Sequence, residues 1–303
     1  MVSLLSFAAA AFASDVVQGA HTAGMGGVGV ASANDNAGIT LNPGLIGLVE
    51  RYDVHAHVRF GPTGDLQWAA TALDARTSDV FGAGFAYSGD RFDPPLRNSD
   101  LPGWSLPDEE LSNHRRQDDY TLAFGLPVLD RRASIGLGVL FSRFTHDLHG
   151  KGSTADLHAG IGVRPADWVT VGIGLRNFVQ VDSPQDRPIS AVAGGRLEAG
   201  GRFAVEANLW WTADPLAASK ESFAIGAEVS PAETLRVRLG ASRDGAFAQN
   251  RLTFGLGLVG KSGGGIDYAL LVPLPGEPLQ FRSLVHQIAF RFRAPEDLLE
   301  SDR

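Results

Sequence analysis

Apolar and polar residues alternate with a period of two along most of this chain. In residues 202–211, for example, Phe203 and Leu209 fall on one face, while Glu206 and Asn208 fall on the other. Successive side chains of a β-strand point to opposite sides, so this pattern predicts strands with one apolar side and one polar or small side. Such alternation is typical of a membrane barrel with lipid outside and a polar lumen.

Fourteen alternating segments can be counted in the sequence. They lie near residues 53–60, 66–73, 80–88, 119–126, 133–144, 153–164, 168–176, 188–197, 201–212, 222–230, 234–243, 249–259, 265–273 and 281–293. Most are close in length to the ~9–11 residues that a tilted strand needs to cross a bilayer. We therefore predict an all-β fold, an antiparallel transmembrane β-barrel of about 14 strands, the even number usual in bacterial barrels.

The connections between these segments give a second indication. Those after odd-numbered segments are longer than those after even-numbered ones. Outer-membrane barrels have short periplasmic turns and longer outside loops, so we expect the odd-numbered connections to face outward. The alternative is a secreted β-sandwich or propeller. Such a fold would need its second face covered by packing partners, whereas here that face carries Arg, Glu and Gly.

Residues 1–13 form an apolar stretch that ends in Ala11-Phe12-Ala13. An apolar run with a small-x-small site predicts a cleaved secretory signal peptide, and the run is too short to span a bilayer as a helix. An N-terminal core helix is the alternative. No later run is apolar and long enough for a transmembrane helix, so insertion in a membrane would have to use strands.

Composition excludes several classes of protein. The formal net charge is −8, which argues against a nucleic-acid partner, because nucleic-acid binders show a basic face. The chain has no Cys, which excludes disulfides, thiolate metal sites and cysteine nucleophiles. The 37 Gly in 303 residues disfavour a helix-rich fold, since each interior Gly costs a helix ~1 kcal/mol relative to Ala.

Residues 19–49 do not alternate and are rich in glycine. Residues 24–29 satisfy G-x-G-x-x-G, the dinucleotide fingerprint, but that motif has meaning only between a buried strand and a helix. Here it follows the apolar leader and precedes a turn-rich stretch. We interpret it as a compact segment whose glycines permit tight folding.

The same segment carries the motif A-x-G-M-G-G-x-x-x-A-x-x-x-N-D-x-A followed by N-P. It resembles the N-terminal motif of the FadL / PorV-PorQ superfamily of outer-membrane β-barrel proteins. The motif residues are Gly24, Met25, Gly26, Gly27, Asn34, Asp35, Asn42, Pro43 and Gly44. Asp267-Tyr268-Ala269 and His286-Gln287-Ile288 resemble the PorV-like ending. The chain departs from the family in having N-P-G for N-P-A and Ala289 for a serine.

The resemblance implies a fourteen-stranded barrel with an N-terminal plug, or hatch, in the lumen. It divides the chain into a signal peptide at 1–13, the plug at 14–50, the barrel at 51–293 and a charged tail at 294–303. Period-two spacing places a set of polar side chains on the lumen face, where they can satisfy the backbone of an inserted segment. These residues are His55, His57, Arg59, Arg176, Glu206, Glu228, Arg236, Arg238, Arg251 and Asp267.

The resemblance also implies two possible functions at the cell outer membrane. FadL-like proteins pass long-chain fatty acids and other hydrophobic small molecules inward, so we predict passive uptake of such ligands through a lipid-embedded channel. PorV-like proteins instead dock exported proteins in a secretion system, which is the alternative function. Outer-membrane lipid and a hydrophobic ligand are the expected partners, with secretion-system proteins under the alternative.

The longest connection, residues 89–118, is the candidate ligand loop. It combines apolar side chains with charges, and a solvated tether would not need so many large apolar groups. Its candidate residues are Phe92, Leu101, Trp104, Leu106, Arg115 and Arg116, the two arginines for a carboxylate head group. A lid packed over the barrel mouth, with arginines that are simply solvated, is the alternative interpretation.

The sequence gives little support for an enzyme. Ser283 and His286 are three positions apart on a strand and point to opposite faces. His55 and His57 share a face but lack a third metal ligand. We therefore predict no catalytic residue, no metal and no cofactor.

Aromatic residues near the strand ends predict an interfacial girdle. They are Trp68, Trp168, Trp210, Trp211 and Tyr120. Such rings lie where lipid head groups meet the acyl chains, because they have an apolar body and a polar tip.

Overall fold

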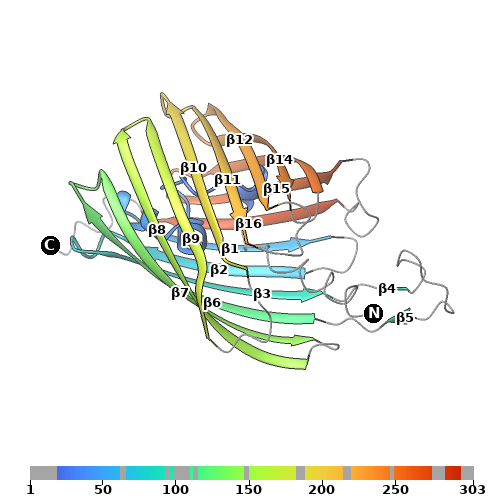
Figure 1. The fold of residues 1–303 in the computed structure, drawn as a ribbon. Coiled ribbons are helices and arrows are strands. Elements are labelled where there is room, and N and C mark those ends of the chain that lie inside the picture. The colour runs from blue at the N-terminus through green and yellow to red at the C-terminus, as the bar shows by residue number, and fades with distance from the viewer. Residues whose placement is uncertain are drawn as a thin grey trace.

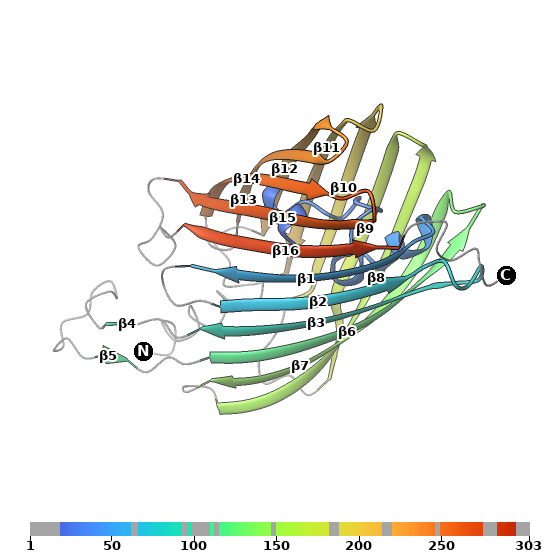
Figure 2. The ribbon, with the colours of Figure 1, turned by 180° about the vertical axis from the view of Figure 1, so that it is seen from behind.

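A computed structural model describes residues 19–61, 66–92, 96–97, 110–111, 115–146, 150–181, 188–213, 220–245, 249–274 and 284–294. Its main feature is a closed barrel of antiparallel strands that follow one another around the ring in chain order (Figure 1). The last strand pairs with the first and closes the ring (Figure 2). Within the described residues, no helix is long and apolar enough to cross a membrane.

Fourteen strands form the barrel, as predicted. They are β1 (Tyr52–Phe60), β2 (Leu66–Asp74), β3 (Gly82–Phe92), β6 (Arg115–Val128), β7 (Ala133–His146), β8 (Gly150–Ala166), β9 (Val169–Val181), β10 (Ser190–Ala199), β11 (Phe203–Thr212), β12 (Glu221–Ala232), β13 (Leu235–Asp244), β14 (Gln249–Val259), β15 (Gly264–Pro273) and β16 (Val285–Arg293). Each overlaps one of the predicted segments, because period-two alternation is a direct consequence of strand geometry.

The connection predicted at 89–118 is shorter in the structure. β3 runs on to Phe92 and β6 already begins at Arg115. Two short strands, β4 (Leu96–Arg97) and β5 (Glu110–Leu111), pair with each other outside the barrel. The sequence prediction was wrong here because polar residues at the ends of β3 and β6 break the apolar alternation while the backbone ladder continues.

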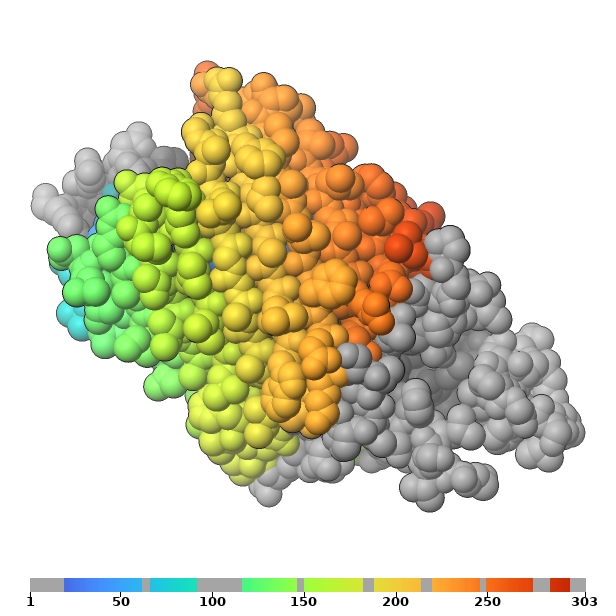
Figure 3. All heavy atoms as spheres, turned by 45° about the horizontal axis from the view of Figure 1, so that its top comes forward, coloured from blue at the N-terminus to red at the C-terminus, as the bar shows by residue number. Residues whose placement is uncertain are grey.

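The outer face of the barrel is apolar. Leu137, Ile173, Leu239 and Leu256 are each more than half exposed, and their strand neighbours on that face are apolar as well. Figure 3 views this outer wall over β8 to β13. A contiguous apolar surface of this extent is unfavourable in water, whereas it matches the hydrocarbon of a bilayer. The exterior therefore has the composition of a lipid-facing surface.

One end of the barrel has tight turns. The turn between β10 and β11 contains Gly200 and Gly201, whose φ angles are +55° and +64°. The turn between β6 and β7 places Leu129, Asp130 and Arg131 at positive φ. β1 begins and β16 ends at this same end, opposite the connections that follow odd-numbered strands. It is called the short-turn end below.

Residues 19–49 lie inside the ring of strands and are called the lumen segment (blue in Figures 1 and 2). The segment contains α2 (Ala20–Gly24), α3 (Gly38–Leu41) and a 3-10 helix, η1 (Pro43–Leu48). α2 packs against β14, β15 and β16, while η1 packs against β6, β7 and β8. The segment thus reaches from one side of the lumen to the other. The predicted signal peptide lies outside the described residues.

Glycines let the lumen segment approach the wall closely. A Cβ added to Gly44 would lie 2.6 Å from Ile161 Cα, and one added to Gly174 would lie 2.7 Å from the carbonyl oxygen of Leu41. Side chains at these positions would force the two backbones apart. Several glycines on the lumen face of the strands, among them Gly136, Gly174 and Gly240, are therefore explained by contact with the inserted chain.

Candidate functional site

The lumen segment is fixed to the barrel wall at several polar points, the first of which is Asn42. This side chain is fully buried. Its Nδ2 donates to the carbonyl oxygens of Val30, at 2.9 Å, and Ile161, at 3.1 Å, and its Oδ1 accepts from the Gly44 amide at 3.1 Å. One amide group thus caps η1 and ties the segment to both itself and β8.

Glu206 of β11 is the second point of attachment. Its carboxylate is completely buried and accepts hydrogen bonds from the Ala31 amide, at 3.0 Å, and from the Ser32 hydroxyl. Arg196 Nη1 lies 3.5 Å from the same carboxylate. A buried charge is tolerated when it is paired and hydrogen-bonded, and both conditions hold here.

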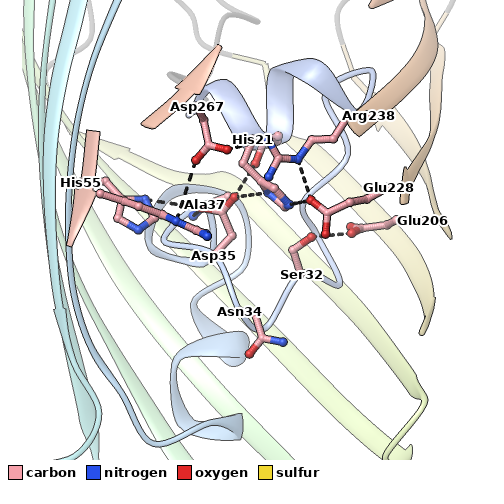
Figure 4. A network of polar contacts seen from close by, with 12 residues as sticks. His21, Ser32, Asn34, Asp35, Ala37, His55, Glu206, Glu228, Arg238 and Asp267 are labelled. Carbon is pink, nitrogen blue, oxygen red and sulfur yellow. Dashed lines mark hydrogen bonds and ion pairs between the residues drawn. The ribbon is translucent and has the colours of Figure 1, made fainter. Parts of the chain in front are cut away.

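His21 of α2 is the centre of the third point of attachment (Figure 4). Its Nδ1 lies 2.6 Å from Asp35 Oδ2, within the lumen segment, and its Nε2 lies 3.3 Å from Glu228 Oε2 of β12. Asp35 also accepts from Thr22 Oγ1 at 3.0 Å and from the Ala37 amide at 3.1 Å. The imidazole therefore bridges one carboxylate of the segment and one of the wall.

Arg238 of β13 continues this network along the wall. Its Nε lies 2.6 Å from Glu228 Oε2, and its Nη1 lies 2.6 Å from Asp267 Oδ1 of β15. Arg238 is 2% exposed. It thereby links two wall carboxylates that would otherwise repel each other in a buried setting.

The charges of His21 and Asp35 stabilise each other. Burial and the nearby Arg238 lower the pKa of His21, but the hydrogen bonds to Asp35 and Glu228 outweigh them and raise it above its ordinary value. Burial would raise the pKa of Asp35, yet the contact with His21 holds it well below its usual range. The closed arrangement therefore favours a protonated imidazole beside an ionised carboxylate.

A fourth attachment lies at the short-turn end. Arg293 of β16 donates to both carboxylate oxygens of Asp53, each at 2.8 Å, and to the Asn34 carbonyl at 2.8 Å. Arg51 donates to the Asp35 carbonyl at 2.7 Å. These two arginines hold the stretch around Asp35 against β1 and β16.

A cavity of about 320 Å³ adjoins the His21 bridge. It extends to the short-turn end, where Arg202 and Arg236 line it, and it is bounded by Asp35, Glu228 and Arg238 at the bridge. Most of its lining side chains are polar or charged. Such a cavity suits water and polar solutes better than hydrocarbon.

Apolar side chains face the lumen elsewhere. Trp210 of β11 packs against two buried clusters, one of Val30, Ala37, Leu41 and Val192 and one of Met25, Val28 and Ala224. The prediction that Trp210 belongs to the outer girdle is therefore wrong. Trp211, its neighbour, is 43% exposed on the outer face. Adjacent strand residues must point to opposite sides, so only one of the pair can face lipid.

Two other predicted girdle residues, Trp168 and Tyr120, do face outward. Trp168 is 60% exposed and Tyr120 41% exposed on the outer face. A Cβ on Gly89 would meet the ring of Trp68, which covers the neighbouring strand at that point. Tyr120 also stands beside Tyr87, with ring centroids 5.1 Å apart.

The structure places the predicted lumen residues on the inner face of their strands. It brings Glu228, Arg238 and Asp267 together around His21, and Glu206 beneath Ser32. The other predicted lumen residues are His57, Arg59, Arg176, Arg236 and Arg251, together with His55, whose Nδ1 lies 3.9 Å from Asp35 Oδ1. Arg236 donates to the Ala232 carbonyl at 3.2 Å, and Arg251 to Gln249 at 2.5 Å.

The motif residues occupy distinct positions in the lumen segment. Gly24 accepts a 3.0 Å hydrogen bond from Thr253 Oγ1 of β14, and Met25 is fully buried. Gly26 and Gly27 turn the chain at φ +82° and +87°. Pro43 begins η1, where its missing N–H costs nothing.

Part of the candidate ligand loop lies outside the described residues, namely Leu101, Trp104 and Leu106. For Phe92 and Arg115 the structure describes only their membership of β3 and β6. Arg116 is exposed on the outer side of β6, with its Nε 3.1 Å from Asp118 Oδ2. Its nearest charged partner is thus a protein carboxylate.

Several residues of the site were missed by sequence reasoning. His21, Arg51, Arg196 and Arg293 were not singled out, although Arg196 and Arg293 have lumen-facing spacing on β10 and β16. That spacing was the available signal. His21 offered none, because its wall partner, Glu228, lies on a strand that follows about 200 residues later, and only barrel closure brings the two near.

A closed barrel with an apolar exterior and a folded segment in its lumen defines an outer-membrane type of transmembrane β-barrel. No protein-family model and no curated protein matches the chain. Several solved structures do match the chain. The toluene transporter TbuX of Ralstonia pickettii has a TM-score of 0.63 at 14% identity, over 92% of this chain and 98% of that one.

Two more solved structures show the same likeness. The toluene transporter TodX of Pseudomonas putida has a TM-score of 0.67 at 12% identity, over 91% of this chain and 97% of that one. A Pseudomonas aeruginosa FadL homologue has a TM-score of 0.68 at 11% identity, over 91% and 98%. The chain therefore has the fold of FadL-type outer-membrane transporters, and the resemblance read from its sequence motifs is confirmed at the level of the fold.

Proposed function

We propose that this protein is a non-enzymatic outer-membrane channel for the passive uptake of hydrophobic small molecules. The observation that carries the proposal is the fold, which matches hydrocarbon transporters over more than nine tenths of each chain. Long-chain fatty acids and aromatic hydrocarbons are both candidate ligands. In this proposal the lumen segment acts as a plug that closes the barrel to polar solutes.

The lumen has an apolar surface that suits such ligands. Leu140 and Phe144 of β7 point inward beyond Gly136 and Gly138, where that strand meets Pro43 of η1, and both are buried. Trp210 joins apolar residues of the lumen segment to those of the wall. Removing from water the apolar surface of the ligand and of the partly exposed Trp210 ring would supply the free energy of binding.

Trp210 and Trp211 provide a matched pair of variants. The protein is purified from its own membrane in mild detergent, and bound lipophiles are identified by native mass spectrometry. Titration with decane, toluene and oleate follows. We expect Trp210→Ala to weaken binding roughly tenfold, because the inner face of the barrel loses a partly exposed aromatic ring. Trp211→Ala removes a ring from the outer face and should leave binding unchanged.

Two results would reject the proposal. One is the absence of any lipophile together with no binding of the three probes. The other is equal behaviour of the two tryptophan variants. An empty barrel that co-purifies with secretion proteins would instead support the docking function implied by the PorV-like ending.

A further inference from the structure

The His21 bridge stands at a boundary within the barrel. On one side is the cavity of about 320 Å³ that reaches the short-turn end. On the other is the remainder of the lumen segment, with Trp210 and its apolar neighbours. Because Ala20, His21 and Asp35 line the cavity directly, the segment forms part of its wall at this point. A local movement of α2 would enlarge the cavity toward the lumen.

α2 is a favourable place for such a movement. It has only five residues, its first residue has no side-chain cap, and its buried side chains are small. Ala20 and Ala23 pack in one cluster with Ala269, Leu271 and Ala289, and the two alanines bring little apolar area of their own. Besides this cluster and the hydrogen bond from Thr253 to the Gly24 carbonyl, the charged contacts of His21 hold the turn in place. By contrast, η1 contacts β6, β7, β8 and β9 and contains Leu45 and Ile46, both nearly inaccessible.

We propose that His21 is a positioning residue for passage, which clamps α2 to the wall through Asp35 and Glu228, and that loss of its proton releases α2. This inference rests on the proposed channel function. A protonated imidazole can donate from both nitrogens, one to each carboxylate. A neutral imidazole has a single N–H, so one of the two carboxylates then loses its donor and faces a lone pair instead.

Other charged groups around the bridge set the direction of the effect. They are Asp35 of the lumen segment, His55 of β1, Glu228 of β12, Arg238 of β13, Asp267 of β15 and Arg291 of β16. Arg238 pairs with both wall acids, Glu228 and Asp267, whereas the closest charged partner of Asp35 is His21. The raised pKa of His21 means that the clamp is complete at mildly acidic pH and weakens as pH rises through that pKa.

The test uses the absence of cysteine in the chain. Ala20→Cys places one thiol beside the bridge, at a position that is 0% exposed. Ile46→Cys places one in η1, at a position that is 1% exposed, and corrects for thiol ionisation. Both are labelled with a maleimide in the folded barrel. We expect the ratio of the two labelling rates to rise about tenfold between roughly pH 6 and pH 9.

Substitutions at His21 then test whether its charge causes the change in the labelling ratio. His21→Lys stays charged throughout this range and should keep the ratio low. His21→Gln should make it high and independent of pH. His286→Gln, which removes a histidine that contacts Tyr268 on β15, should behave as the unsubstituted protein. A flat ratio in the unsubstituted background, or an unchanged rise in His21→Gln, would overturn the proposal.

Uptake of a hydrophobic probe in the same preparations separates the two hypotheses. Labelling that depends on pH without any uptake would reject the channel function and keep the clamp. Uptake with labelling that ignores pH would reject the clamp and keep the channel.

Discussion

The side-chain amide of Asn42 donates a 3.1 Å hydrogen bond to the backbone carbonyl of Ile161, 119 positions later in the chain. This contact joins the lumen segment to β8, and Asn42 is fully buried there. A buried carbonyl that loses its donor costs free energy. Removing the donor therefore destabilises the protein by more than the net contribution of the bond to stability.

Replacement of Asn42 tests whether the lumen segment seals the barrel. Asn42→Ala leaves the Val30 and Ile161 carbonyls without this donor and should destabilise the segment by about 1–3 kcal/mol for each unpaired group. We expect proteoliposomes with this variant to become permeable to small sugars, while the barrel keeps its heat-modifiable migration on gels. Asn34→Ala, at an exposed position, is the control. Equal permeability of both variants would show that Asn42 does not seal the lumen.

Close backbone packing predicts a second effect, at Gly44. A Cβ there would lie 2.6 Å from Ile161 Cα, a distance that backbone atoms cannot relieve without moving. Gly44→Ala should therefore displace η1 and lower the midpoint of thermal unfolding, at a cost of about 1–3 kcal/mol. Gly195→Ala is a matched control on β10, because nothing lies within 4 Å of its added Cβ. The same midpoint for both would contradict the packing described for η1.

Removal of Arg238 should be more damaging than removal of Arg236, two positions earlier on the same strand. Arg238→Gln leaves Glu228 and Asp267 without their shared cation in a buried site, which costs about 3–5 kcal/mol. Arg236 has no carboxylate within 4.0 Å among the described residues, so Arg236→Gln should change stability by at most about 0.5 kcal/mol. Urea unfolding in lipid vesicles measures both. A similar loss in the two variants would mean that the ion pairs contribute little.

The apolar exterior predicts sensitivity to charge at mid-strand. Leu239, halfway along β13, is 54% exposed on the outer face. If lipid surrounds this position, Leu239→Arg should cost about 2–4 kcal/mol when the protein folds into vesicles. Leu129→Arg, in the turn between β6 and β7, should cost at most about 1 kcal/mol, since the turn lies beyond the hydrocarbon. Tolerance of arginine at residue 239 would argue against a lipid-facing β13.

Much of the barrel could be predicted from sequence because the geometry of a strand requires apolar and polar residues to alternate along the chain. Period two fixed which residues of β11 face outward, so Phe203 and Leu209 were assigned correctly beside Glu206 and Asn208. Trp210 was placed wrongly in the girdle because its residue type was followed there instead of the period-two rule. Strand ends were less certain, as β6 shows, because ladder hydrogen bonds continue where the apolar pattern stops.

The contacts of the lumen segment with the barrel wall could not be predicted from the sequence. The sequence by itself determined that residues 19–49 do not form strands, that glycines line one face of the barrel wall, and that acids and arginines share that face. Only the tertiary structure decided that Glu228 meets His21, that Glu206 meets Ser32 and that Ile161 meets Asn42. The reason is physical. Alternation is a property of neighbours along the chain, whereas these contacts depend on register and closure around the whole ring.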